Sequence, residues 1–168
     1  MIDLTQATQL APHFTLEEAC FSETATRLGI GNIPPDSVLP ALRNTARSME
    51  VVRTLLGAPI LVNSWYRSLA LNTALKSPRS SQHIKGEAVD FRAPVFGSPR
   101  KICEYLLTME TRVRWHQLIL EHTWVHISWI SIPGAHQSGQ VLSLLSNGGY
   151  ATGLTDSRGV AFPPDSLV

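Results

Sequence analysis

The sequence has no long hydrophobic run. No stretch of its 168 residues approaches the roughly 18 consecutive apolar residues that a membrane-spanning helix requires. The first residues, MIDLTQ, have neither the basic region nor the apolar region of a secretory signal. We therefore expect a protein that is not inserted in a membrane and that is cytoplasmic at synthesis.

A surplus of charge of one sign is also missing. The sequence has 14 Lys and Arg residues against 13 Asp and Glu residues, and its formal net charge is +1. It contains no run rich in Lys and Arg and no interleaving of basic with aromatic residues. Nucleic-acid binding depends on neutralising many phosphates with such residues, so the sequence predicts no nucleic-acid partner.

Cysteine is scarce as well. The two cysteines, Cys20 and Cys103, lie far apart in the sequence and do not form a C-x-x-C motif. Two cysteines do not make a disulfide framework of the kind that small secreted domains use. We therefore expect two buried, reduced thiols.

The length and composition predict one globular domain. Hydrophobic residues make up 43% of the sequence, and a chain of 168 residues is long enough to bury a core without disulfides or metals. No internal repeat or low-complexity segment divides the chain. We expect a lead-in over residues 1–13, a folded domain over residues 14–150 and a surface tail over residues 151–168, in a protein that is a monomer.

Local signals predict several helices along the chain. Thr15, followed three residues later by Glu18, has the pattern of a capping box at the start of a short helix. Apolar residues recur at steps of three and four over residues 36–56, which indicates an amphipathic helix that Gly57 ends. Ser98 followed by Pro99 is typical of a helix start, with the proline in the first turn.

Other segments have the composition of strands. They combine β-branched and aromatic residues, and turn residues bound them. These segments are residues 59–62, 88–91, 117–121 and 124–129, with an edge strand over residues 141–145 and a turn at residues 147–149. A second short helix is expected after Ser68, which is a favourable N-cap residue.

The two central strands predict a hairpin with a defined register. A loop centred on His122 and Thr123 pairs Glu121 with Trp124. Two residues further along, the same register pairs residue 119 with His126. Because side chains alternate along a strand, Glu121 and His126 should face the same side of the sheet.

One stretch contains two residues that bind metals. His83 and Asp90 lie seven positions apart, and Gly86 between them supplies the conformational freedom that a tight turn needs. We expect His83 in a loop and Asp90 on the strand that follows. His126 is the best candidate for a third ligand. Two histidines and one aspartate leave a fourth tetrahedral position open to water, as in catalytic zinc sites.

Four blocks of the sequence, in this order, resemble a known family. They are FTLEE at residues 14–18, YRS at residues 66–68, S-x-H-x-x-G-x-A-x-D at residues 81–90, and QLI-x-E followed by WVHIS within residues 117–128. The chain resembles the M15 family of zinc D-alanyl-D-alanine peptidases, especially the small bacteriophage forms, over residues 14–129. This resemblance implies a single small α+β domain of the Hedgehog/DD-peptidase type. Its antiparallel sheet would carry the metal site, with helices packed on one side.

The resemblance also implies roles for individual residues. His83, Asp90 and His126 would hold one Zn²⁺ ion. Glu121 would be the general base, with His122 as the alternative. Two further residues would contact the substrate: Arg67 would receive a carboxylate, and Ser81 would be a polar neighbour.

Trp124 is the tryptophan that we expect to line the substrate site. The implied function is hydrolysis of peptide bonds in the stem peptides or cross-links of bacterial peptidoglycan, by a carboxypeptidase or an endopeptidase. We expect it to act on the cell wall in phage lysis or as part of a virion. The alternative is a module that keeps the fold without catalysis and binds the cell wall or a virion partner.

Overall fold

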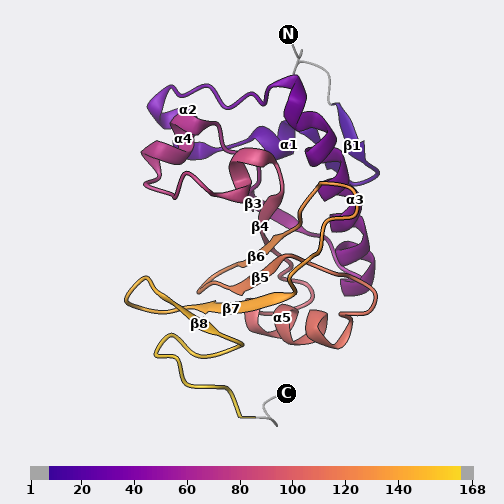
Figure 1. The fold of residues 1–168 in the computed structure, drawn as a ribbon, viewed down its shortest axis with the longest axis vertical. Coiled ribbons are helices and arrows are strands. Elements are labelled where there is room, and N and C mark those ends of the chain that lie inside the picture. The colour runs from indigo at the N-terminus through magenta and orange to yellow at the C-terminus, as the bar shows by residue number, and fades with distance from the viewer. Residues whose placement is uncertain (1–7, 164–168) are drawn as a thin grey trace.

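The structure is a computed structural model, and it describes residues 8–163. Short helices and strands precede a central helix, and most of the strands follow it (Figure 1). In chain order the elements are β1 (Gln9–Ala11), β2 (Phe14–Thr15), α1 (Leu16–Cys20), α2 (Glu23–Leu28), the 3₁₀ helix η1 (Asp36–Val38), α3 (Leu39–Leu56), β3 (Leu61–Ser64), α4 (Leu69–Ala74), the 3₁₀ helix η2 (Gln82–Lys85), β4 (Ala88–Arg92), α5 (Pro99–Thr108), β5 (Gln117–Leu120), β6 (Val125–Ser128), β7 (Gln140–Leu144) and β8 (Tyr150–Thr152).

The main sheet has the strand order β3-β4-β6-β5-β7-β8. Each neighbouring pair is antiparallel except β5 and β7, which are parallel. The expected α+β class is confirmed, but the sheet is therefore not purely antiparallel. β7 follows β6 in the chain but lies on the other side of β5. Because β5 and β7 both run opposite to β6, they are parallel to each other. The predicted strand at residues 141–145 is present as β7, but its predicted position at the edge of the sheet was wrong, because β8 pairs with the outer side of β7.

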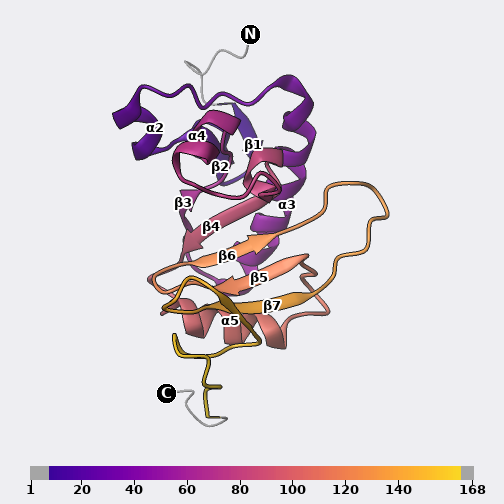
Figure 2. The ribbon, with the colours of Figure 1, turned by 60° about the vertical axis from the view of Figure 1, so that its left-hand side comes forward.

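The hydrophobic core lies between one face of this sheet and the helices α3 and α5, which both cover that face (Figure 2). In α3 the buried residues Leu42, Ala46, Met49 and Val52 recur at the predicted spacing and form a stripe toward the sheet. Helices α1, α2 and α4 lie beyond the β3 edge of the sheet (Figure 1). The other face of the sheet is thus left free of α3 and α5.

The predicted helix starts and stops are present. The Thr15 hydroxyl accepts a hydrogen bond from the Glu18 backbone N–H at 3.1 Å, which is the expected cap of α1. Gly57 ends α3 in the left-handed conformation with φ of +59°. Ser98 caps α5, and Pro99 is its first residue. Both cysteines are buried free thiols, as the sequence predicted.

Regular structure continues beyond the expected ends of the domain. β1 lies within the predicted lead-in, and its residues Leu10 and Ala11 belong to the core. At the other end β8 reaches Thr152, and Thr155 is buried, with its backbone N–H donating a hydrogen bond to the Ser143 hydroxyl at 2.9 Å. Residues 1–7 of the lead-in and residues 164–168 of the tail lie outside the described residues. Within the described part of the chain, no helix combines the length and the apolar character that crossing a membrane requires.

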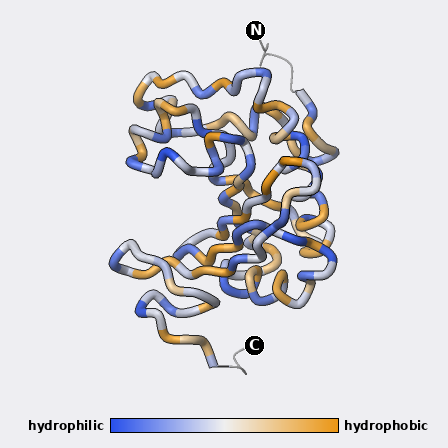
Figure 3. Tube along the Cα trace, in the orientation of Figure 1, coloured by the Kyte–Doolittle hydropathy of each residue, from blue (hydrophilic) through white to orange (hydrophobic). Residues whose placement is uncertain are grey.

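The hydropathy of the chain matches the arrangement of the sheet and its covering helices. Hydrophobic segments alternate with hydrophilic ones along the strands, and the tip of the hairpin between β7 and β8 is hydrophilic (Figure 3). That tip is the predicted turn at residues 147–149, where the Asn147 side chain accepts a hydrogen bond from the Gly149 backbone at 2.9 Å. The turn is the local reason for the additional strand β8.

Candidate metal centre

A cavity of about 1090 Å³ lies on the sheet face opposite α3 and α5. We call this cavity the main cleft. Its floor is formed by side chains of the sheet strands, and the segment 77–83 forms one of its walls. This volume exceeds the range of about 300–1,000 Å³ that is typical of sites for small organic ligands, so the cleft has room for a short peptide.

The strand register brings candidate ligands together on the floor of the main cleft. Asp90 on β4 pairs with His126 on β6, and His126 pairs with Ile119 on β5. Residues that are directly paired across a sheet point to the same face. The alternate residues Val89 and Ile127 are fully buried in the core on the opposite face. The predicted hairpin register is thereby confirmed, including the hydrogen bond from the Glu121 N–H to the Trp124 carbonyl at 3.1 Å.

His83 comes from η2, whose end is set by Gly86. Gly86 has φ of +72°, and a Cβ there would lie 2.9 Å from the Leu42 side chain, so glycine is required. The His83 Nδ1 lies 2.7 Å from the Trp65 carbonyl oxygen. A carbonyl only accepts hydrogen bonds, so Nδ1 carries the proton and Nε2 keeps a free lone pair. This is how proteins commonly orient a metal-binding histidine.

Asp90 lies between the two histidines. Its Oδ1 is 3.3 Å from the His83 Nε2 and 2.8 Å from the His126 Nδ1. Burial raises the pKa of Asp90, but the two imidazoles outweigh this effect and hold the pKa far below its ordinary value. The carboxylate is therefore ionised, as a metal ligand must be.

The three side chains fit a zinc ion. One ligand atom each from His83, Asp90 and His126 lies within 4.8 Å of the others. Two imidazole nitrogens and one carboxylate oxygen are ligands that Zn²⁺ prefers, and three protein ligands leave a position for water. Burial outweighs the charge of Asp90 and lowers the pKa of His83, which favours the neutral imidazole that binds a cation.

Arg67 also lies at this centre. Its Nη2 donates a hydrogen bond to the Asp90 Oδ2 at 2.6 Å, and its Nε donates to the Ser64 hydroxyl at 2.9 Å. The ion pair is largely buried, with side-chain exposures of 14% for Arg67 and 7% for Asp90. The guanidinium therefore holds one oxygen of Asp90 and leaves the other facing the histidines. Binding of a substrate carboxylate by Arg67 stays a prediction.

The candidate bases differ in position. Glu121 lines the main cleft together with Asp90 and His126. Burial and the nearby charge of Asp90 raise the pKa of Glu121 above its ordinary value of 4.5. His122 is exposed and lines a separate, smaller cavity. The geometry thus favours Glu121 over His122 as a base.

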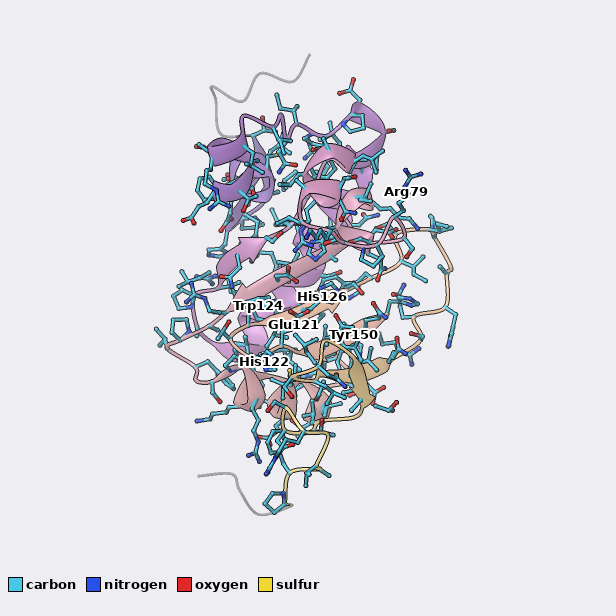
Figure 4. All side chains as sticks on the ribbon, turned by 90° about the vertical axis from the view of Figure 1, so that its left-hand side faces the viewer. Arg79, Glu121, His122, Trp124, His126 and Tyr150 are labelled. Carbon is cyan, nitrogen blue, oxygen red and sulfur yellow. The ribbon has the colours of Figure 1, made fainter. Side chains whose placement is uncertain are left out.

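The other expected contact residues also lie at the main cleft. Ser81 and Trp124 both line it, Ser81 from the wall and Trp124 from the position just before β6. Figure 4 looks onto this region and shows Trp124 grouped with Glu121 and His126 in the middle of the molecule. Arg79 lies apart from this group, toward the helical end (Figure 4).

The main cleft also contains residues that were not expected from the sequence, among them Glu87, His116 and Tyr150. The Glu87 carboxylate is buried and accepts a hydrogen bond from the Ser131 N–H at 2.8 Å. Burial raises the pKa of Tyr150, and the charges of Glu121 and Asp90 raise it further, so its phenol keeps its proton. Tyr150 directly follows the predicted turn at residues 147–149, and this is the signal that could have placed it on an added strand.

Comparison with known proteins agrees with the geometry. The chain matches the family model described as Peptidase M15 over residues 12–128, which is more than half of its 168 residues. A search of curated proteins found no match. The matched region includes the three candidate ligands and Glu121, whereas β7, β8 and the loop before them lie after it. The chain therefore belongs to the peptidase M15 family and is a peptidase.

Proposed function

We propose that the protein is a zinc-dependent peptidase that hydrolyses peptide bonds in bacterial peptidoglycan, in stem peptides or in cross-links. One observation carries the proposal: ligand atoms of His83, Asp90 and His126 lie within 4.8 Å of one another on the floor of a cleft large enough for a peptide. Membership of the peptidase M15 family supports the class of reaction. The peptidoglycan substrate rests on the resemblance to zinc D-alanyl-D-alanine peptidases.

His83 Nε2, Asp90 Oδ1 and a ring nitrogen of His126 would hold the zinc ion. The chemistry that zinc supplies is the acidification of water and the polarisation of a carbonyl group. Glu121 would take a proton from the attacking water and pass it to the departing amine. Its raised pKa brings it closer to neutral pH, where such a proton exchange is most efficient.

The remaining residues would position these groups. Arg67 holds Asp90 and brings a positive charge beside the scissile carbonyl. Ser81 would contact the polar backbone of the peptide, and Trp124 would form an apolar wall of the cleft. We propose that the protein acts as a monomer, and size-exclusion chromatography with light scattering tests this.

The proposal includes a role in phage lysis or in a virion, as in the small bacteriophage forms that the sequence resembles. Such a role gives the peptidase access to the cell wall. Fractionation of infected cells and purified particles tests it. Detection in the particles or at the cell wall during lysis would support it, and confinement to the cytoplasm of intact cells throughout infection would contradict it.

The test of the activity uses purified muropeptides, with and without a chelator, and mass spectrometry of the products. We expect cleavage that the chelator abolishes and that added zinc restores. Glu121→Gln should abolish cleavage but keep zinc binding, whereas the exposed residue in Glu17→Gln is a matched control and should keep both. A protein that binds zinc and muropeptides without cleaving any of them would instead be a binding module.

A further inference from the structure

Glu87 places a buried carboxylate in the main cleft, outside the metal centre. The residue is 7% exposed and lines the cleft. Its Oε1 accepts a hydrogen bond from the Ser131 N–H at 2.8 Å. Among residues 8–163, Glu87 forms no ion pair with a Lys, Arg or His side chain. Buried charges in proteins are normally paired, so a single N–H donor leaves the Oε2 of Glu87 available to a ligand.

The distance of Glu87 from the metal centre follows from the sequence. Glu87 directly precedes β4 and lies three residues before the candidate ligand Asp90. An extended chain rises about 3.4 Å per residue, so the two residues are about 10 Å apart along the strand direction. Three residues of an extended peptide in the cleft cover the same distance. A group on the substrate within three residues of the scissile bond therefore reaches Glu87.

Two further hydrogen-bond acceptors, on Gln82 and His116, line the cleft near Glu87. The Gln82 Nε2 donates to the Trp129 carbonyl at 3.0 Å, which leaves its amide oxygen for another donor. The backbone places Glu87 and His116 on either side of β6, because the Trp129 N–H bonds to the Glu87 carbonyl and the His116 N–H to the Ser128 carbonyl. The His116 Nδ1 is buried without a hydrogen-bond partner in the described part of the chain, which is rare for a buried polar atom. We call Gln82, Glu87 and His116 the acceptor subsite.

The chemistry of the acceptor subsite matches a primary ammonium group. Such a group has three N–H donors and no acceptor, and its positive charge balances the carboxylate of Glu87. An anionic ligand group would be repelled, and a neutral one would leave the buried charge unpaired. Lys85 also lines the main cleft, but it is exposed, so solvent screens its repulsion of a bound ammonium group. In a stem peptide, the side chain of the diamino acid ends in a primary amine.

We propose that the acceptor subsite binds the side-chain ammonium group of a diamino acid in the peptide substrate, with Glu87 as the residue that determines this specificity. This inference rests on the proposed function. A contact held at a fixed distance from the metal centre positions the peptide along the cleft, and so sets which of its bonds lies at the metal centre. Glu87 thereby selects peptides whose diamino acid has a free amine over peptides in which this amine is acylated.

The experiment compares purified muropeptides, monomeric and cross-linked, before and after acetylation of the free side-chain amine of the diamino acid. Acetylation removes the positive charge and leaves the peptide bonds of the stem unchanged. For the zinc-loaded protein we expect kcat/KM to be about 10- to 100-fold higher for the unmodified form, as one hydrogen bond between charged groups predicts. Equal kcat/KM for the two forms would overturn the inference but leave the proposed function intact. Cleavage of no muropeptide in either form would overturn both.

Glu87→Gln separates recognition of the charge from a structural role of Glu87. Glutamine has nearly the same size and keeps an oxygen that accepts from the Ser131 N–H. The variant should lower kcat/KM for the unmodified form by about tenfold or more, with unchanged zinc affinity and nearly unchanged kcat/KM for the acetylated form. A preference caused only by the bulk of the acetyl group would persist in this variant.

The control is Glu17→Gln, which makes the same change at an exposed residue of α1 and should keep the wild-type preference. His116→Phe removes the Nδ1 acceptor from the acceptor subsite and should also reduce the preference, so it replaces Glu87→Gln if that variant does not fold. A folded Glu87→Gln variant that keeps the full preference for the unmodified form would refute the inference.

Discussion

Replacing Arg67 should weaken zinc binding more than it weakens substrate binding. The guanidinium donates to the Asp90 Oδ2 at 2.6 Å, while Oδ1 faces the two imidazoles. Without this hydrogen bond the carboxylate is free to rotate, and both of its oxygens become available to solvent or to the histidines. Arg67 thus acts on the metal through Asp90, as a positioning residue.

The size of the effect follows from the contact. A hydrogen bond to a charged group contributes about 1.5–3 kcal/mol, and about 1.4 kcal/mol corresponds to a factor of ten in affinity. We therefore expect a loss of about 10- to 100-fold in zinc affinity, the usual range for residues that hold a metal ligand. Arg67→Lys should show the larger loss of zinc affinity, because lysine keeps a positive charge near the cation but lacks the fork-shaped guanidinium that holds Asp90. Arg67→Met should show the smaller loss of zinc affinity, because methionine also removes the positive charge that repels the zinc ion.

The assay is competition for zinc against a chromophoric chelator, with Arg47→Met as the control. The Arg47 side chain bonds to Asn44 on the exposed surface of α3, far in sequence from the metal centre, so its loss should leave zinc affinity unchanged. The same variants are then tested on a peptide with a free carboxyl terminus and on its amidated form.

Two results together would refute this reasoning. The first is an unchanged zinc affinity in both Arg67 variants. The second is a KM that depends on the free carboxyl terminus in the wild type but not in the variants. That pattern would show Arg67 to bind the substrate carboxylate, as the sequence resemblance implies.

Three further predictions concern stability. Gly86→Ala should destabilise the protein by about 1–3 kcal/mol more than Gly134→Ala in urea unfolding. Both glycines have positive φ, of +72° and +76°, but of the two only Gly86 would place a Cβ within 4 Å of other atoms. Equal losses would show that the contact with Leu42 is relieved without cost. Zinc at about 100 times its Kd should raise the free energy of unfolding by about 2.7 kcal/mol, which calorimetry would detect as a higher Tm. His83→Ala should abolish this stabilisation, whereas the control His136→Ala, in an exposed loop, should keep it. Stabilisation of the His83→Ala variant by zinc would place the metal elsewhere. Glu121→Gln should stabilise the metal-free protein at neutral pH and not at acidic pH. The folded-state pKa of Glu121 is raised above 4.5, so the protein with Glu121 loses stability as the pH rises through that pKa, and the variant does not; urea unfolding at a series of pH values measures the difference, and a difference independent of pH would contradict the raised pKa.

The sequence predicted the parts of the site that local rules determine. An even loop between two strands fixes which residues pair, and this gave the register of Glu121 with Trp124 and of residue 119 with His126. The positive φ of Gly86 followed from the need for a tight turn between His83 and a strand. The α+β class and the family followed from the order of the four sequence blocks, and the family model confirms the family.

The parts that were missed depend on contacts between distant segments. The position of β7 beside β5 and not beside β6 is a choice among sheet edges, which the alternation of residues 141–145 does not encode. Once β7 lies there, the turn at residues 147–149 places Tyr150 on β8 and so at the main cleft. His116 precedes a strand, and it lines the main cleft because of the path of the chain before β5. Periodicity and composition contain no signal for the placement of β7 beside β5 or of His116 at the main cleft.

The three residues after β3 tie the metal centre together. The Trp65 carbonyl fixes the His83 ring at 2.7 Å, and the Trp65 indole N–H donates to the Gly86 carbonyl at 3.3 Å. Two residues later, Arg67 fixes Asp90 through its side chain, and its backbone N–H donates to the His83 carbonyl at 3.2 Å. Trp65 is fully buried, so the core anchors this segment. Two of the three ligands are thus oriented by one short segment that itself supplies no ligand. The third, His126, is placed by strand pairing with Asp90, whose Oδ1 lies 2.8 Å from the His126 Nδ1. The geometry of the site therefore depends on how β3 and the core are packed as much as on the identity of the ligands.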